Sequence, residues 1–327
     1  MSTAKPLATL SLDLDDKWSY LKTRGHPSWV SLPSYLSTLI PRVLDFLKHR
    51  NLTITVFIVG LDAEQERNRD LLQSIAQSGH EIGNHSFHHE PWLHLYTREQ
   101  LQTELDSAEQ AITRATGVHP VGFRGPGFSY SADLIDLLVR RFYLYDASTL
   151  PTYLGPLARA YYFKHARLSE QQSDERKSLF GNFKDGARPN CAYWWQTGTG
   201  KLLEIPVTTM PYLRVPIHAS YLVYLSSFAS SLALRYFKIA LSLCRLGGTE
   251  PSLLLHPLDF LGCDDTSDLE FFPAMRMHSR QKCSFLARVL DLYMEEFTVI
   301  PLQEYARQFE QRKNVLAYKS SSRDATL

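Results

Sequence analysis

Two histidines in the segment Gly79–His89 are the side chains best placed to do metal chemistry. His85 and His89 stand four residues apart, behind a glycine-bearing turn. If the segment makes one helical turn, both imidazoles face the same way and can bind one divalent metal ion. A metal held by two histidines needs at least a third ligand, usually a carboxylate. The run Leu12–Lys17 near the start of the chain contains three carboxylates that could supply it.

Polar residues also follow several expected strands at the point where each strand ends. An isolated His-x-x-x-His pattern often arises without a metal, so the interpretation depends on whether other residues converge on the same place. In an α/β barrel the carboxyl ends of the strands and the loops after them form one face, where sites are built. Singly, these residues have ordinary alternatives: a surface charge, a turn cap or a core histidine. Their common position favours a site composed of Asp13, Asp15 and Asp16 after the first strand, His85 and His89 after the third, Arg124 at the fourth, Asp146 at the fifth and His256 at a later one.

The elements that must position these groups alternate between short apolar runs and helix-like segments, which is typical of a parallel sheet or barrel wrapped by helices. Expected strands are Ala8–Leu14, Thr53–Val59, Glu81–Asn84, Val121–Arg124, Leu144–Asp146, Leu202–Val207, Ser252–His256 and Val299–Ile300. Expected helices are Tyr35–Arg50, Asn68–Ser78, Arg98–Thr116 and Ser131–Arg141, the third with a capping box formed by Thr97 and Gln100. We expect a single domain over residues 1–327, with an insertion at 153–200 and a flexible C-terminal tail at 308–327.

Composition excludes several classes of protein. The 327 residues are 44% hydrophobic and 21% charged, which is typical of a folded globular chain and not of a disordered one. The net charge of +1 argues against nucleic acid as a partner. Four widely spaced cysteines and the lack of an apolar signal core before the first strand favour a cytoplasmic protein. Residues 215–234 carry no charged side chain, and we expect two short helices there, suited to peripheral contact with the inner face of a membrane.

Five blocks in order resemble the motifs of the polysaccharide deacetylase superfamily (NodB-homology domains, carbohydrate esterase family 4). The likeness is greatest to the branch found with bacterial exopolysaccharide genes, which ends in Leu-His-Pro followed by an acidic residue. It covers residues 8–150 well and residues 200–262 moderately, and it does not cover the insertion. The blocks are Asp13–Asp16, His85–His89, Phe123–Gly127, Tyr145–Ser148 and Leu255–Pro257.

The resemblance implies an α/β fold, a distorted (β/α)7-type barrel (NodB-like) with the inserted segment over the catalytic face. It also implies metal-dependent hydrolysis of an N-acyl group, usually N-acetyl, on an amino sugar. The roles carried over are metal binding by Asp16, His85 and His89, general base for Asp15, holding of that base by Arg124, general acid for His256 and support near His256 by Asp146. We expect substrate contacts from Pro126, Gly127, Tyr145, Trp194 and Trp195, with core packing the equal alternative for the two tryptophans.

Two alternatives stay open in this assignment. Asp13 stands where the family usually has threonine, so it could take the base role instead of Asp15. His88 precedes His89, and helix geometry also allows the three-residue spacing from His85, although the family pattern favours His89.

The chemistry agrees with the resemblance, since an amide needs a polarised carbonyl and an activated water. A metal such as zinc lowers the pKa of its water from 15.7 to about 7. A carboxylate then takes the water proton, and an acid protonates the departing amine. Two histidines and a carboxylate suit Zn first, and Co, Ni, Mn or Fe as well.

The substrate would be a polysaccharide, oligosaccharide or glycolipid, and its sugar and acyl group, like the oligomeric state, are not readable from the sequence. One alternative function is a deformylase or deacetylase acting on a lipid-linked sugar at the membrane surface. Another is a catalytically inactive carbohydrate-binding barrel.

Overall fold

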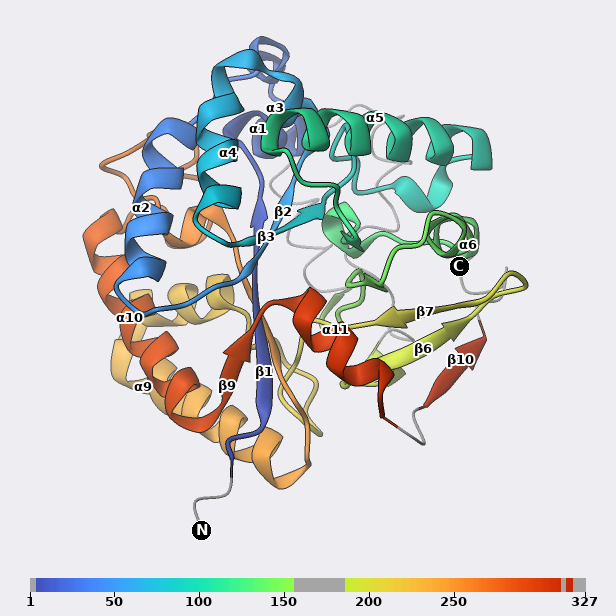
Figure 1. Cartoon of the computed structure of the whole chain (residues 1–327). Helices are drawn as coiled ribbons and strands as arrows, with labels where there is room; N and C mark the ends of the chain where they lie inside the picture. The colour runs from blue at the N-terminus through green and yellow to red at the C-terminus, as the bar shows by residue number, and fades with distance from the viewer. Residues whose placement is uncertain (1–3, 156–185, 313–315, 320–327) are drawn as a thin grey trace.

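The first strand belongs to one large, mostly parallel sheet, in which it has three strand partners. The structure, a computed structural model, describes residues 4–155, 186–312 and 316–319 (Figure 1). Strand β1 (Leu7–Leu14) pairs in parallel with β2 (Thr55–Ile58), with β8 (Ser252–Leu255) and, at its start, with β9 (Thr298–Ile300). Its inward side carries Thr9, Ser11 and Asp13, because successive side chains of a strand point to opposite faces and the leucines between them pack against the helices.

The sheet continues from β2 through short parallel strands to an antiparallel pair, and one more strand lies beyond that pair at the edge. The order is β10-β6-β7-β5-β4-β3-β2-β1-β8. Strands β3 (Glu81–Asn84), β4 (Gly122–Phe123), β5 (Tyr145–Asp146) and β7 (Lys201–Glu204) are parallel, whereas β6 (Tyr193–Gln196) runs antiparallel to β7 and pairs with β10 (Ala317–Lys319). The predicted α/β class is therefore confirmed.

The barrel is not closed by a strand ladder within the described residues. The chain after β7 does approach β8, since the Thr208 N–H donates to the Ser252 carbonyl at 3.0 Å. All the strand ends from β1 to β5 thus face a common edge, as the predicted site requires.

Helices cover the sheet at the positions that the apolar periodicity predicted. The capping box of Thr97 and Gln100 begins α5 as expected. Figure 1 shows α2, α4 and α10 on one side of β1 and α11 in front of the sheet. The helices are α1 (Lys17–Arg24), α2 (Leu36–Lys48), α3 (Gly60–Glu64), α4 (Arg69–Gln77), α5 (Arg98–Thr116), α6 (Ala132–Arg140), α9 (Ala219–Leu246), α10 (Ser279–Glu296) and α11 (Leu302–Glu310).

Three expectations from the sequence concern the rest of the chain. The uncharged stretch 215–234 enters α9, in which two helical segments meet at the non-helical residue Ala229 (φ −157°, ψ 98°), so two helices are present as expected, although the second continues to Leu246. Across the described ranges, no helix is both long and apolar enough to span a membrane. Strand β6, which lies within the expected insertion at 153–200, pairs with β7 in the sheet. Strand β10 likewise lies within the expected tail, and residues 156–185, 313–315 and 320–327 lie outside the described residues.

Candidate active site

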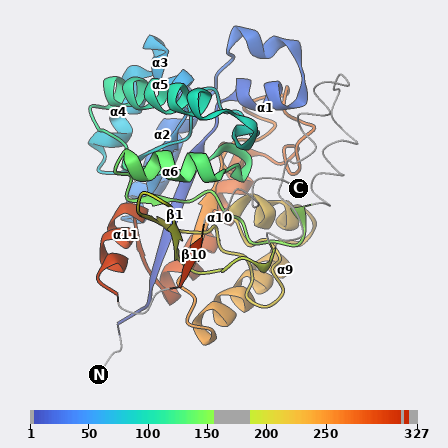
Figure 2. The ribbon, with the colours of Figure 1, turned by 90° about the vertical axis from the view of Figure 1, so that its right-hand side faces the viewer.

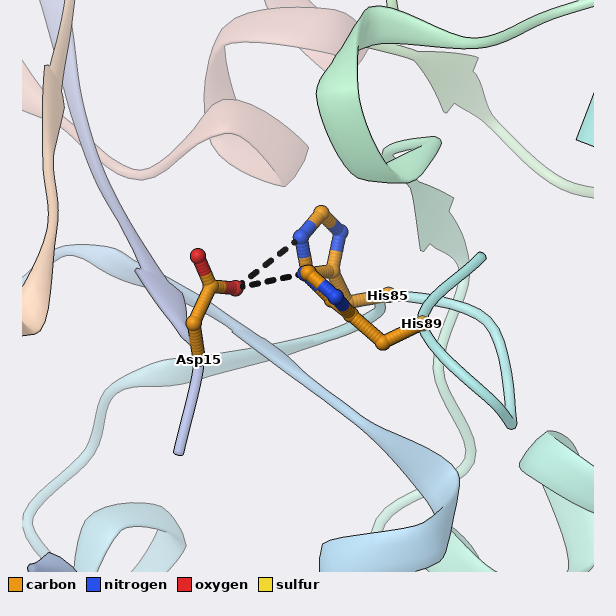
Figure 3. A group of neighbouring side chains, drawn as sticks. All are labelled: Asp15, His85 and His89. Atoms are coloured by element: carbon orange, nitrogen blue, oxygen red, sulfur yellow. Dashed lines mark ion pairs between the residues drawn. The ribbon is translucent and has the colours of Figure 1, made fainter. Parts of the chain in front are cut away.

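Asp15, His85 and His89 bring three potential metal-ligand atoms together. Figure 3 shows both imidazoles pointing at the Asp15 carboxylate. The Oδ1 atom of Asp15 lies 3.3 Å from Nε2 of His85 and 3.0 Å from Nε2 of His89. No hydrogen bond satisfies this buried Oδ1 atom. The donor set, two imidazole nitrogens and a carboxylate oxygen within 4.8 Å of one another, fits a divalent transition metal.

The protonation state of His85 suits ligation. Its Nδ1 donates a hydrogen bond to the Arg124 carbonyl at 2.7 Å, and a carbonyl only accepts. In the neutral ring the lone pair therefore sits on Nε2, the atom that faces Asp15. A histidine fixed in this way by its second nitrogen is the usual arrangement of a metal ligand. Although burial disfavours ionisation of Asp15, His89 and His85 in their protonated forms hold the pKa of its carboxyl well below the usual value. With neutral imidazoles, a bound metal ion would supply that positive charge.

A loop, and not a helical turn, makes the two histidines converge. Asn84 Oδ1 accepts a hydrogen bond from the Ser86 N–H at 2.8 Å, and Ser86 Oγ accepts one from the His89 N–H at 3.2 Å. Both Ser86 and His89 have positive φ, 62° and 53°. Such backbone conformations cost about 1–3 kcal/mol each and persist only where the surroundings hold them. Two of them beside a candidate site indicate that the loop is built for function.

Glu104 of α5 holds this loop and turns His88 away from the site. Its Oε1 accepts hydrogen bonds from the backbone N–H of Phe87 and of His88, and its Oε2 lies 2.8 Å from His88 Nδ1. The hydrogen bond to Glu104 raises the pKa of His88. The structure thus places His89, and not His88, beside His85.

Asp13 lies next to this group and is held by Arg124. Its Oδ1 accepts a hydrogen bond from an Arg124 guanidinium nitrogen at 2.8 Å, and its Oδ2 lies 3.9 Å from His85 Nε2. Arg124 is fully buried, and it also donates to Ser11 Oγ and to the Ala147 carbonyl. Its guanidinium carbon stacks 4.4 Å from the centre of the Phe57 ring. A buried guanidinium fixed this firmly orients the Asp13 carboxylate.

His256 approaches Asp13 from the end of β8. Its Nε2 lies 4.0 Å from Asp13 Oδ2, and its imidazole is 23% exposed. On the other side of the ring, Nδ1 lies 3.0 Å from the hydroxyl of Ser220, in the first turn of α9. Asp259, which is buried, accepts a hydrogen bond from the His256 N–H at 2.8 Å and one from the Ser220 hydroxyl. The Nε2 atom of His256 therefore faces the site, while Nδ1 is connected through the Ser220 hydroxyl to the Asp259 carboxylate.

Asp16 has a structural position, which differs from the predicted one. Its Oδ1 caps α1 by accepting hydrogen bonds from the Lys17 N–H at 2.7 Å and the Tyr35 N–H at 3.0 Å. Burial raises the pKa of Asp16 to about 6. The sequence-based assignment paired Asp16 with the histidines and made Asp15 the base, whereas the structure brings Asp15 to the histidines and Asp13 to Arg124. The reason is the two-residue period of extended chain, which puts Asp13 and Asp15 on one side and Asp16 on the other.

The structure gives Asp146 partners just after its own strand and on the neighbouring strand, and its support of the site near His256 stays a prediction. Asp146 Oδ1 accepts a hydrogen bond from Ser148 Oγ at 2.5 Å, and its carboxyl is hydrogen-bonded to Glu204 on the neighbouring β7. Burial and the nearby Asp146 raise the pKa of Glu204 well above its usual value. Two buried carboxyl groups so close together share a proton, because they cannot both ionise. The pair joins the ends of β5 and β7.

Three of the five expected substrate contacts are core residues. Tyr145 is fully buried, and its hydroxyl donates to Glu81 at the start of β3, away from the strand ends that carry the site. Trp195 is 1% exposed and donates from its indole to Glu204, and Trp194, 8% exposed, packs on Phe309. The core-packing alternative thus holds for both tryptophans.

The remaining two substrate-contact residues, Pro126 and Gly127, follow Arg124 in the loop after β4. Pro126 is buried and Gly127 is exposed. Gly127 has φ +59°, and a Cβ there would lie 2.8 Å from Pro91 Cβ. Their contact with substrate stays a prediction.

Sequence reasoning missed Ser220, Asp259 and Glu104. Asp259 had a signal, because it is the acidic residue that follows the Leu255–Pro257 block. Ser220 lies in the uncharged stretch and Glu104 is one of many charged residues on an amphipathic helix, so no local pattern distinguishes either.

Comparison with known proteins supports the family resemblance for the first part of the chain. The family model for polysaccharide deacetylase matches residues 11–142, which include Asp13, Asp15, both histidines and Arg124. Residues 11–142 are thus similar to a polysaccharide deacetylase domain. The exopolysaccharide-locus branch stays a prediction.

Curated relatives match about a quarter of this chain. The peptidoglycan-N-acetylmuramic acid deacetylase PdaA of Bacillus subtilis is 40% identical over 83 residues, 25% of this chain and 30% of the relative. A peptidoglycan-N-acetylglucosamine deacetylase of Bacillus cereus is 34% identical over 86 residues, 26% of this chain and 30% of the relative. The chain thus spans less than a third of the length of these two relatives.

Solved structures share the fold over nearly the whole chain. A Mycobacterium smegmatis protein named as a polysaccharide deacetylase superposes with a TM-score of 0.62 at 20% identity, covering 97% of this chain and 96% of its own. A similarly named protein of Pseudomonas aeruginosa PAO1 gives a TM-score of 0.56 at 18% identity, with 94% and 92% covered. At these identities the likeness concerns the fold alone.

Proposed function

We propose that this protein is a metal-dependent hydrolase that removes an N-acyl group, in the first instance N-acetyl, from an amino sugar. The observation that carries the proposal is the meeting of Asp15, His85 and His89 beside a carboxylate held by Arg124, with His256 opposite. A ligand group, a candidate base and a candidate acid within one small space are the parts that amide hydrolysis needs.

Asp15, His85 and His89 would hold the metal ion. When bound, the ion would polarise the amide carbonyl and acidify a water molecule, and zinc is the first candidate, with Co, Ni, Mn and Fe also compatible with this donor set. The unsatisfied Oδ1 atom of Asp15 and the Nδ1–H tautomer of His85 support this fit.

Asp13 is the candidate general base in place of Asp15. It would accept the proton of the attacking water, and the hydrogen bond from Arg124 would orient its carboxylate for that task. Asp13 precedes Asp15 by two residues of extended chain, so the two carboxylates lie on the same side of the chain.

His256 is the candidate general acid. The departing amine needs a proton, and Nε2 of His256, which lies 4.0 Å from Asp13 Oδ2, would supply it. In the protonated ring Nδ1–H donates to Ser220, whose hydroxyl donates in turn to Asp259, so this chain would stabilise the imidazolium. Ser220 and Asp259 act through His256 and are positioning residues.

The substrate class follows from the relatives' names. Peptidoglycan and chitin deacetylases are among the curated relatives that match part of this chain, so N-acetylated glycans of these kinds are the first substrates to test. A second candidate is a glycolipid carried at the cytoplasmic face of a membrane. The exposed apolar side chains of α9 favour it, and four free cysteines are compatible with that reducing compartment.

The test is acetate release from purified protein given N-acetylglucosamine oligomers, peptidoglycan fragments and an N-acylated glycolipid. Stripping with a chelator should abolish release, and one of the candidate metals should restore it. Binding of the oligomers without acetate release under any metal would instead favour the inactive carbohydrate-binding barrel. Release that survives complete metal removal would overturn the metal-dependent mechanism.

A further inference from the structure

The outer face of α9 carries large apolar side chains that the fold does not use. Leu232, Ile239 and Leu246 are 62%, 51% and 83% exposed. They recur every seven residues. Seven residues make almost two full turns of a helix, short by only about 20°, so all three side chains lie on one face. Phe228, just before the bend at Ala229, is 74% exposed.

The inner face of the same helix is already packed. Leu222, Phe237 and Leu241 are buried, and α9 lies beside α10 (Figure 2). The outer side chains therefore add nothing to the core. Four exposed large apolar residues on one helix exceed the scattered single residues of an ordinary surface.

Basic residues accompany this apolar row, and acidic residues do not. Arg235 lies between Leu232 and Ile239 on the same face, and Lys238 lies beside it. Neither has an ion-pair partner within the described residues, whereas Arg245, near the end of the helix, pairs with Glu296 of α10. From residue 205 to residue 249 the sequence has no Asp or Glu.

We propose that the α9 outer face, comprising Leu232, Arg235, Lys238, Ile239 and Leu246, docks on an anionic lipid bilayer. A helix with a row of exposed apolar side chains flanked by Lys and Arg is suited to lie in a membrane interface. Lipid phosphates supply the anionic partners that Arg235 and Lys238 lack. A second copy of this chain would not supply anionic partners, because a symmetric contact would bring the two positively charged faces together.

The same helix connects this face to the candidate site. The first turn of α9 carries Ser220, which contacts His256. One consequence of docking rests on the proposed function: a lipid-linked sugar amide in the bilayer would be presented at the candidate site. The docking itself depends on the face alone.

Co-sedimentation of the full chain with vesicles tests the proposal. Vesicles of phosphatidylglycerol mixed with phosphatidylcholine should bind the protein, and pure phosphatidylcholine vesicles should bind it much less. Replacing Arg235 and Lys238 together by glutamine should weaken binding roughly thirtyfold, from about 1 kcal/mol for each cation. Replacing Leu232 and Ile239 together by glutamine should weaken it on the order of tenfold or more.

The matched control is Phe142→Asn, which removes a side chain 86% exposed elsewhere on the surface, at a backbone φ of 61° that asparagine tolerates. It should leave vesicle binding unchanged. Failure of the wild type to bind anionic vesicles would overturn the proposal. So would a dimer in solution that the Leu232/Ile239 double variant disrupts, with no vesicle binding. Acetate release from soluble oligomers, measured on the same variants, separates either failure from a failure of the proposed function.

Discussion

Replacing Arg124 by methionine should cost far more stability than the loss of any surface charge. Its guanidinium is fully buried, and it bonds to Asp13, Ser11 and the Ala147 carbonyl. Removing one partner of a buried ion pair costs about 3–5 kcal/mol, because the other charge is left uncompensated. We therefore expect a loss of that size in the free energy of unfolding.

Urea denaturation at neutral pH, with a chelator present to remove metal-linked stabilisation, measures this loss. The double variant Arg124→Met with Asp13→Asn should recover about 1–3 kcal/mol relative to the sum of the single changes, since the stranded carboxylate is gone. Arg141→Met is the control, because Arg141 pairs with Asp106 and Glu109 near the surface and should cost about 0–1 kcal/mol. A loss below about 1 kcal/mol for Arg124→Met, or strict additivity in the double variant, would refute the argument.

Three further outcomes are expected. Asp13→Asn should keep the metal and lower the rate of acetate release about 10²–10⁴-fold, and retained activity would return the base role to another carboxylate. Ser220→Ala should lower kcat about 10–100-fold with little change in KM, and Ser220→Thr, which keeps the hydroxyl, should restore kcat. An unchanged kcat in Ser220→Ala would remove Ser220 from the account. Glu104→Gln should destabilise the protein most between about pH 4.5 and 6.5, as urea denaturation at pH values inside and above this window can show. Burial opposes ionisation of Glu104, but hydrogen bonds from His88 lower its pKa, so the stability that Glu104 contributes is lost as pH falls. The hydrogen bond to Glu104 raises the pKa of His88, so the stability that His88 contributes is lost as pH rises. An equal loss of stability at all pH values would contradict this.

The sequence predicted the fold well because its elements are strongly periodic and clearly bounded. Strand Glu81–Asn84 and helix Arg98–Thr116 have the predicted bounds, the helix because a capping box begins it and Gly117 ends it in the left-handed conformation. Strand β6 was less readable, since its tryptophans were equally compatible with a substrate surface and with the core. Only the pairing of β6 with β7 decides between them.

The candidate site was predicted in its members but not in all of its roles. His85, His89, Arg124 and His256 meet as their places after successive strands suggested. The choice among the three carboxylates depended on one residue of register, and a slip of one residue reverses which side of the chain a group faces. Alternation along β1 contained the answer: Asp13 and Asp15 share a side, and Asp16 is free to cap α1.

Partners that come from distant elements were beyond the reach of sequence patterns. Ser220 contacts His256 across 36 residues, and Glu104 reaches the His85–His89 loop from α5. Nothing local marks either residue, because the contact exists only once the helices pack on the sheet.

The most direct test of the central claim is the metal content of two matched variants, Asp15→Asn and Asp16→Asn, after dialysis and elemental analysis. Asparagine at position 16 can still cap α1 through its amide oxygen, so this variant and the wild type should each keep one metal ion per chain. Asp15→Asn should lose it, because the carboxylate that faces both His85 and His89 is gone. Metal retained by Asp15→Asn and lost by Asp16→Asn would contradict the proposed site.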